Sequence, residues 1–350
     1  MNGKWRNSTR TMIWCTAFFF VFWLSVNFTI AQTPSPALLV LEKSDNMLAI
    51  VDPATLQTVA RVPAGPDPHE IVVSADGKFA YISNYGGNDS ALNTISVVDL
   101  AARKALPPIN LGALHSAHGL AFAGGKLYFT AETNKVIGRY DPAAQSVDWV
   151  LGTGQDRTHM IAVSEDIDRI FTSNVNSGTI SIIELVSAPV SGPPPVAVRK
   201  TWRVTNVAAG RGAEGFDLSS DGKEIWAANA QDATVTIIDI ASKKVMDTVA
   251  IPVRGANRLK FTPDGKQVLI SGLGGGATNN LAVLDAITRK VIRTFDWGGG
   301  AAGIVMVPDG SRAFVAVSGK DKVAALDLKS WEVMGFASTG KQPDGLAWVP

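Results

Sequence analysis

The side chains best suited to chemistry are histidines that recur in register along the chain. His69, His118 and His159 are three of the four histidines, and each precedes a short, largely apolar run. The same alignment adds four residues to this column, which are Glu214, Asn257, Ala302 and Asp344. Imidazoles and carboxylates that converge from different repeats suit Zn, Cu, Ni or Fe. The column therefore predicts a divalent metal ion held by His69, His118, His159 and Glu214.

The same column also has a simpler interpretation. No CxxC, HExxH or EF-hand spacing accompanies it, and such local motifs are the strongest sequence signals of a metal site. The side chains would equally cap strand ends and bind water in a polar channel. Both interpretations stay open at the level of sequence.

Basic residues lie next to this column in the chain. They are Arg157, Arg211, Arg254 and Arg258, with Lys341 nearby. Guanidinium groups bind carboxylates and phosphates through paired hydrogen bonds, which favours an anionic small molecule as ligand. We expect such a ligand to contact Arg157, Arg211, Arg258 and Asp344. Solvated surface arginines are the alternative.

Short β-strands in a repeat must position these residues. The segment from Phe216 to Ile251 contains four strand-like runs and an Asp-Gly turn. In each of seven copies an acid ends one run, at Asp52, Asp99, Asp141, Glu184, Asp239, Asp285 and Asp327. A spacing of roughly forty to fifty residues with four strands per copy is typical of propeller blades. We therefore predict an all-β, seven-bladed β-propeller.

Two further columns of residues are expected to have structural roles. The acids are expected to accept backbone N–H groups in the turns they begin. Large apolar residues of the second strand are expected to pack between adjacent blades. They are Tyr81, Phe129, Phe171, Trp226 and Phe314, with Leu39 and Leu269 in the other copies.

The chain ends and the insertions complete the predicted architecture. The first copy lacks its opening strand, and Asp344–Val349 supplies one, so pairing of the two ends would close the ring. Glycine-rich insertions at 84–94 and 272–280 fall between second and third strands. A proline-rich insertion at 187–199 falls between third and fourth strands, on the other face.

The N-terminus has the layout of a secretory signal peptide. Cations at positions 4, 6 and 10 precede an apolar run from Met12 to about Ile30, and a small-residue site ends at Ala31. We expect residues 1–31 to be the signal peptide, 32–37 a linker and 38–350 the propeller, located in the periplasm or outside the cell. The apolar run is long, so an uncleaved membrane anchor is the alternative.

Composition limits the partners. The only cysteine, Cys15, lies in the leader, so the propeller has no disulfide. Without the three leader cations the formal net charge changes from +1 to −2. This balance argues against nucleic acid as a partner, and no stable membrane insertion is expected after signal cleavage.

The repeat itself resembles a known family. DGKFAYISN and NTISVVD in one blade, and DGKEIWAAN and ATVTIID in another, resemble the repeat of YVTN-type β-propellers. The resemblance covers residues 38–350 and implies a seven-bladed fold related to bacterial lactonase-like propellers. The family contains periplasmic and surface binding proteins, and the wider superfamily includes lactonases and cofactor-bearing oxidoreductases. Likeness of fold does not assign chemistry.

Three functions are consistent with these observations. The first is an exported binding or scaffold propeller that holds a small ligand or a protein partner at the channel-mouth face, since no complete catalytic motif is present. The second is a metal-dependent lactonase- or lyase-like enzyme that acts on an anionic small molecule. The third is display to a protein partner through the proline-rich and glycine-rich insertions.

Overall fold

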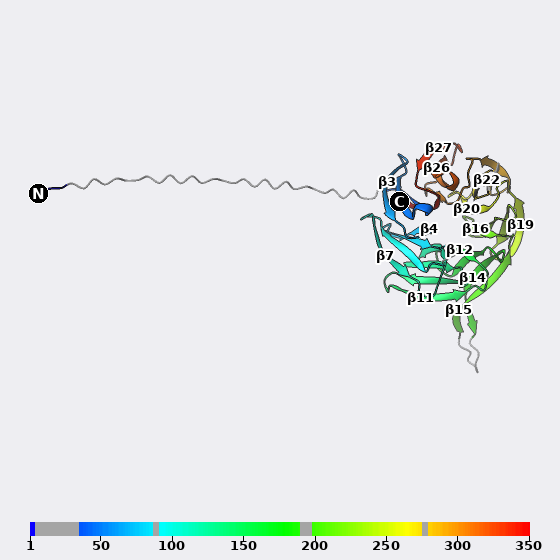
Figure 1. The fold of residues 1–350 in the computed structure, drawn as a ribbon. Coiled ribbons are helices and arrows are strands. Elements are labelled where there is room, and N and C mark those ends of the chain that lie inside the picture. Colours follow the sequence, from blue (N-terminus) through cyan, green and yellow to red (C-terminus); the bar gives the residue numbers. More distant parts are fainter. Residues whose placement is uncertain (4–34, 87–90, 190–197, 275–278) are drawn as a thin grey trace. The chain divides into compact units, whose positions relative to one another are not determined.

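The chain folds into seven four-stranded antiparallel sheets arranged in a ring (Figure 1). The computed structural model describes residues 1–3, 35–86, 91–189, 198–274 and 279–350. Contacts divide the chain into residues 1–31 and residues 32–350, and every sheet belongs to the second unit. The predicted all-β, seven-bladed architecture is confirmed. Nearly all of the predicted signal peptide lies outside the described residues.

The inner half of each blade consists of two strands. The first, innermost strands are β4 (Pro68–Val73), β8 (Ala117–Ala123), β12 (Thr158–Val163), β16 (Ala213–Leu218), β20 (Ala256–Phe261), β24 (Ile304–Met306) and β28 (Pro343–Val349). The second strands are β1 (Ala37–Glu42), β5 (Phe79–Asn84), β9 (Lys126–Ala131), β13 (Arg169–Asn174), β17 (Glu224–Asn229), β21 (Gln267–Gly272) and β25 (Arg312–Val317). In Figure 1 the labels β4, β12, β16 and β20 surround the middle of the ring.

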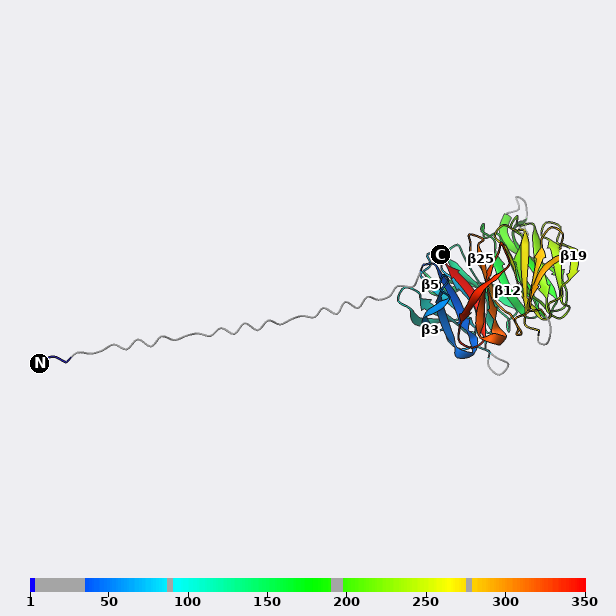
Figure 2. The ribbon, with the colours of Figure 1, turned by 90° about the horizontal axis from the view of Figure 1, so that it is seen from above.

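The outer half consists of two more strands. The third strands are β2 (Met47–Asp52), β6 (Thr94–Asp99), β10 (Val136–Asp141), β14 (Thr179–Pro189), β18 (Thr234–Asp239), β22 (Leu281–Asp285) and β26 (Lys322–Asp327). The fourth strands are β3 (Gln57–Pro63), β7 (Lys104–Asn110), β11 (Ser146–Gly152), β15 (Val198–Ala208), β19 (Lys244–Ala250), β23 (Val291–Phe295) and β27 (Val333–Ser338). Figure 2, turned by 90° from Figure 1, shows that the strands run across the thickness of the ring.

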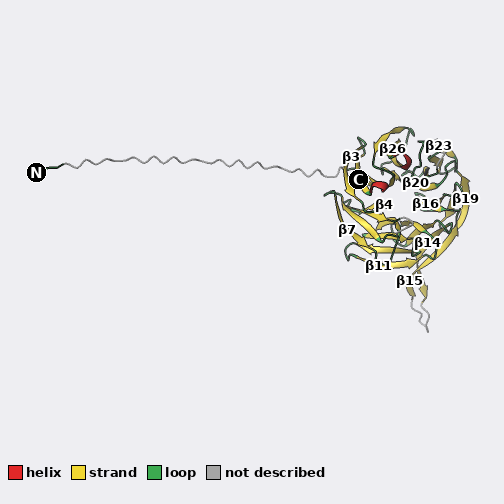
Figure 3. Ribbon diagram, viewed as in Figure 1, coloured by secondary structure: helices red, strands yellow, loops and turns green. Residues whose placement is uncertain are grey.

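Helical structure is limited to two single turns in the described ranges. They are the 3-10 helices η1 (Lys43–Asp45) and η2 (Ser318–Lys320), drawn red in Figure 3. Within the part of the chain that the structure describes, no helix is long and apolar enough to cross a membrane. The long hairpin of β14 and β15 carries the proline-rich insertion and extends beyond the rim (Figure 1).

Strands from both ends of the chain complete one blade. β1 pairs antiparallel with β28, and the register aligns Ala37 with Val349 and Val40 with Leu346. Ser35 Oγ also donates a hydrogen bond of 2.7 Å to the Pro350 carbonyl. The predicted closure is confirmed, and it completes a seventh four-stranded sheet like the other six.

The predicted packing columns are confirmed. The large apolar residues of the second strands are buried, and several join clusters that span two blades. Trp226, for example, packs against Phe261 of the next blade, with ring centroids 5.5 Å apart. Six of the seven acids accept backbone N–H groups in their turns. Glu184 instead pairs with Arg203 and Lys243, because β14 continues past it without turning.

Glycine allows the innermost strands to approach one another. A Cβ atom on Gly119, Gly215, Gly303 or Gly345 would lie 2.2–2.5 Å from a backbone oxygen of the next innermost strand. Hydroxyl side chains of the second strands then join adjacent blades. Thr130, Ser173 and Ser271 donate to the carbonyls of His159, Glu214 and Ala302, at 2.7, 2.5 and 2.5 Å. The backbone around the propeller axis is therefore fixed by the neighbouring blades.

This arrangement makes the axial glycines sensitive to a single methyl group. In Gly303→Ala the new Cβ would lie 2.2 Å from the Asp344 carbonyl oxygen, and overpacking of this kind costs about 1–3 kcal/mol. We expect a corresponding loss of unfolding free energy in urea denaturation. Gly152→Ala is the control, because nothing lies within 4 Å of a Cβ at that position. Equal stability of the two variants would contradict the close-approach argument.

Candidate functional site

Six of the seven residues in the histidine column occupy the same structural position. His69, His118, His159, Glu214, Asn257 and Asp344 are each the second residue of an innermost strand. Ala302 lies two residues before β24. Around them gather Lys43, Glu70, Tyr85, Glu132, Arg157 and Arg258, and we call these polar side chains together the axial cluster.

The three histidines come from consecutive blades and lie side by side. The His118 and His159 ring centroids are 3.7 Å apart with an interplanar angle of 31°. His69 follows at 5.2 Å from His118, in an edge-on arrangement. His118 and His159 are almost completely buried, at 2% and 1% exposed.

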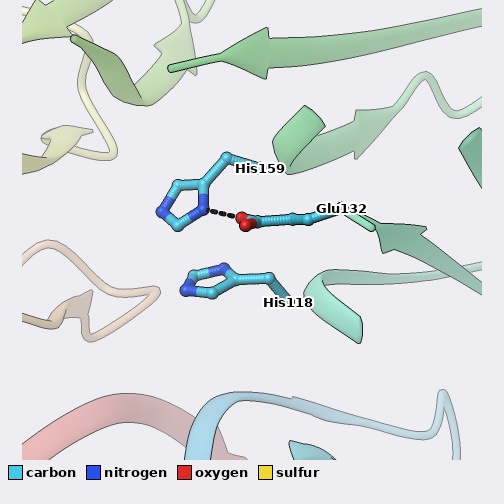
Figure 4. Close-up of side chains that lie close together, drawn as sticks. All are labelled: His118, Glu132 and His159. Atoms are coloured by element: carbon cyan, nitrogen blue, oxygen red, sulfur yellow. Dashed lines mark hydrogen bonds and ion pairs between the residues drawn. The ribbon is translucent and has the colours of Figure 1, made fainter. Parts of the chain in front are cut away.

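Glu132 contacts several side chains of the axial cluster. It follows β9 directly and forms a short hydrogen bond through Oε1 with His159 Nδ1 (Figure 4). Its other oxygen, Oε2, accepts a hydrogen bond of 2.6 Å from the Tyr85 hydroxyl. The Arg157 Nε lies 3.4 Å from the same Oε2 atom. One buried carboxylate thus contacts side chains from the blades on both sides of its own.

The sequence analysis did not single out Glu132, although a signal is present. The residue that follows the second strand forms its own column, which reads Lys43, Tyr85, Glu132, Val175, Ala230, Leu273 and Ser318. The first three members are polar. Tyr85 and Glu132 belong to the blades that carry His69 and His118, and Lys43 belongs to the blade before them. A comparison of this column across blades would have revealed the polar side of the axis.

His69 differs from the other two histidines because both of its ring nitrogens have partners. Its Nε2 lies 2.7 Å from the Lys43 Nζ, and its Nδ1 lies 3.1 Å from the Asp67 carbonyl oxygen. Lys43 also pairs with Asp344 at 3.5 Å. Burial lowers the pKa of His69, and the positive charge of Lys43 acts in the same direction. His69 is therefore a neutral acceptor for Lys43.

The pKa values of His118 and His159 shift in opposite directions, although burial acts on both in the same way. For His118, burial and the adjacent His159 hold the pKa well below its ordinary value. For His159, burial disfavours the charge, but the hydrogen bond to Glu132 and the nearby Glu214 outweigh it and raise the pKa. Their environments therefore favour the neutral form of His118 and the charged form of His159.

Glu214 contacts the second ring nitrogen of His159. Its Oε1 lies 3.4 Å from His159 Nε2 and accepts a hydrogen bond of 2.9 Å from Asn257 Nδ2. Burial alone would raise the pKa of Glu214, whereas the contact with His159 and two nearby arginines lowers it to about 2. Burial and the charge of Glu132 raise the pKa of Tyr85 to about 12. Glu214 is therefore ionised and Tyr85 remains a hydrogen-bond donor.

Two buried ring nitrogens in the cluster lack a hydrogen-bond partner among the described residues. They are His118 Nδ1 and His159 Nε2. The 3.4 Å contact of His159 Nε2 with Glu214 is an ion-pair distance without hydrogen-bond geometry. An unsatisfied buried polar atom costs about 1–3 kcal/mol, so a further partner at these nitrogens would stabilise the cluster.

An ion pair crosses the axis next to the histidines. Arg258 follows Asn257 in β20, and its Nη2 contacts Glu70 Oε1 of β4, which lies 188 positions away in sequence. Both side chains are largely buried, at 8% and 15% exposed. Arg258 Nη1 also donates to the Asn257 carbonyl at 3.1 Å. This pair connects two blades that are not adjacent in the ring.

The two remaining predicted arginines are placed differently. Arg157 is one-third exposed and reaches Glu132. Arg211 is 76% exposed, and its Nε contacts Asp232 at 2.7 Å. The structure thus brings Arg157 and Arg258 into the cluster together with Asp344, while Arg211 pairs on the surface beside it.

Two surface hollows lie away from the cluster. One, of about 560 Å³, is lined by residues that include Asp76, Lys78 and Trp348. The other, of about 650 Å³, is lined by residues that include Tyr81, Pro107 and Tyr140. Neither brings together buried ionisable groups from several blades, as the axial cluster does.

Comparisons with known proteins identify the fold. No family model and no curated protein matches the chain. A protein of unknown function from Desulfotomaculum acetoxidans superposes with a TM-score of 0.69 at 12% identity, covering 89% of this chain and 98% of that one. A candidate 6-phosphogluconolactonase from Bacteroides fragilis gives 0.66 at 16% identity, covering 91% and 99%. The dihydro-haem d1 dehydrogenase NirN, in complex with DHE, gives 0.62 at 16%, covering 89% and 74%. The chain is a seven-bladed β-propeller with lactonase-like propellers among its structural neighbours.

The pair across the axis can be tested by a double-mutant cycle. Loss of Glu70 in Glu70→Leu leaves the buried Arg258 without its closest carboxylate. Breaking a buried pair costs about 3–5 kcal/mol. We expect the double variant Glu70→Leu/Arg258→Met to be more stable than Glu70→Leu alone in urea denaturation. Additive losses from the two single variants would show that the pair contributes no coupling.

Proposed function

We propose that this protein is an exported binding propeller of the YVTN type, which holds a small anionic ligand at the axial cluster. The cations at the exposed side of the cluster support this proposal. Lys43 and Arg157 are 29% and 35% exposed, above histidines that are almost fully buried. Partly exposed cations beside buried polar groups are suited to carboxylate or phosphate groups.

The observation that carries the proposal is the position of the Arg157 side chain. Its left-handed backbone, with φ 56°, belongs to the repeat, because the equivalent residues Asp67, Ser116 and Gln342 have φ 48°, 55° and 54°. The Arg157 side chain is 35% exposed, and its Nε lies 3.4 Å from Glu132 Oε2. A guanidinium carries five N–H donors, so the contact with Glu132 leaves donors for a carboxylate or phosphate group. We infer that the guanidinium binds the ligand.

The ligand test uses three anions of related chemistry. We choose 6-phosphogluconate, gluconate and citrate, because one structural neighbour is a candidate 6-phosphogluconolactonase. Isothermal titration calorimetry in buffer with EDTA should show binding of at least one of them, weakened about tenfold or more by Arg157→Gln. Arg211→Gln is the matched control, since Arg211 pairs with Asp232 on the surface.

The result that overturns the anion site is equally specific. Binding that Arg157→Gln leaves intact, or that Arg211→Gln weakens as strongly, would place the anion elsewhere. Absence of binding for all three anions would remove the ligand class from the proposal.

Lactone hydrolysis is the second candidate function. The buried Glu132–His159 pair favours it, because a carboxylate that orients an imidazole is the usual arrangement of a general base. Turnover of 6-phosphogluconolactone above the buffer rate, lost in His159→Gln, would favour the enzyme over the binding protein. A rate equal to buffer would favour the binding protein.

A further inference from the structure

Three buried side chains from three elements place ligand atoms close together. They are His118 in β8, Glu132 directly after β9 and His159 in β12, and one ligand atom from each lies within 4.8 Å of the others. All three are buried. In Figure 4 the two rings and the carboxylate are directed toward one another.

The unpartnered nitrogen of His118 has no explanation within the described protein. Its Nδ1 atom is buried next to the Glu132–His159 hydrogen bond and has no donor or acceptor of its own. A neutral imidazole carries a lone pair on one of its two ring nitrogens. A neutral imidazole nitrogen that is free and buried is available for a metal ion.

We propose that His118 Nδ1, His159 Nδ1 and the Glu132 carboxylate bind one divalent transition-metal ion. Two imidazoles and one carboxylate form a donor set that suits Zn²⁺ or Fe²⁺ rather than Ca²⁺ or Mg²⁺, which prefer oxygen ligands. Bonds of about 2.0–2.1 Å require an inward rotation of these side chains. Three protein ligands leave at least one coordination position open for water or a ligand. The ion takes the place of the proton between His159 Nδ1 and Glu132 Oε1, and that proton is released to solvent.

The surrounding residues orient these ligands. When His159 Nδ1 binds the ion, its Nε2 carries the ring proton, and Glu214 Oε1 at 3.4 Å accepts it. Asn257 holds Glu214 at 2.9 Å, and Tyr85 holds the second Glu132 oxygen at 2.6 Å. Metal-binding histidines usually donate their other N–H to such a carboxylate. Both unpartnered nitrogens of the cluster are then satisfied.

The assignment differs from the ring predicted from sequence in two ligands. His69 is excluded from the inner set because Lys43 and Asp67 already occupy its two nitrogens. Glu214 becomes an outer carboxylate that orients His159. The charge of the cluster permits a cation, since the four carboxylates Glu70, Glu132, Glu214 and Asp344 outnumber the three cations Lys43, Arg157 and Arg258.

The site goes beyond the proposed anion binding and can be tested without it. The full chain, purified without a histidine tag and stripped with EDTA, is titrated with Zn²⁺ in buffer free of carboxylates and phosphate. We expect one ion per chain by elemental analysis after dialysis. Co²⁺ in place of Zn²⁺ should give visible absorption bands. Variants His118→Gln, His159→Gln and Glu132→Gln should each weaken Zn²⁺ binding by about 100-fold or more.

Matched variants separate the metal ligands from their neighbours. His69→Gln should bind Zn²⁺ within twofold of wild type, because His69 is not a ligand. Glu214→Gln should weaken binding by about 10- to 100-fold, the usual effect of an outer contact. Circular dichroism of each metal-free variant verifies that it is folded, and the Co²⁺ spectrum of the wild type stands independently of any variant.

Two outcomes would overturn the proposal. A wild type that takes up less than about one ion in five chains with both Zn²⁺ and Co²⁺ has no such site. Stoichiometric binding that survives His118→Gln, or that His69→Gln abolishes, assigns the ion to other residues. Because the anion titration is made with EDTA present, a failure there leaves the metal result intact, and the reverse also holds.

Discussion

The innermost strands of adjacent blades approach so closely that four of them carry glycine where a Cβ atom would meet the next backbone. Hydroxyl groups of the second strands then bond to carbonyls across the blade boundary. The residue just before each glycine is thereby held at the axis in a fixed orientation. The positions of His118 and Glu214 follow from this packing, because each directly precedes one of these glycines. His159 is held through its carbonyl oxygen, which accepts a hydrogen bond from Thr130 and which Gly119 approaches.

Close packing at the axis determines how the polar groups there are paired. Side chains that point to the axis from several blades have little access to water, so each charge needs a partner from another blade. Glu132 with His159 and Arg258 with Glu70 are such partners, while Lys43 and Asp344 pair within the blade that the two chain ends share. The cluster is also one-sided. Its acids and bases come mainly from the blades with the histidines, whereas the column after the second strand becomes Val175, Ala230 and Leu273 farther round the ring.

The sequence predicted the fold well because a propeller repeats its packing rules in every blade. The repeat period, the acids in the turns and the aromatic residues all recur. The blade shared by the two chain ends could be recognised because the first copy lacks its opening strand. The histidine column followed from the same register. Glu132 was not predicted. The residue after the second strand attracts attention only when the structure shows that it lies near the propeller axis. Arg157 and Arg211 were predicted to act alike, although Arg157 lies two residues before its column residue and Arg211 lies three before. They separate in space because Arg157 itself adopts the left-handed conformation, while in the next blade Gly212 does so and Arg211 precedes it.

The pairing of β1 with β28 has a consequence for how the domain acquires its site. These strands are more than three hundred positions apart, so their contact is among the most non-local that the chain makes, and non-local contacts form slowly. β28 also delivers Asp344, which pairs with Lys43 beside β1. A chain that emerges gradually from the ribosome therefore holds an open ring with an incomplete cluster until its last strand arrives. Closure of the ring and maturation of the site are then a single event, late in folding.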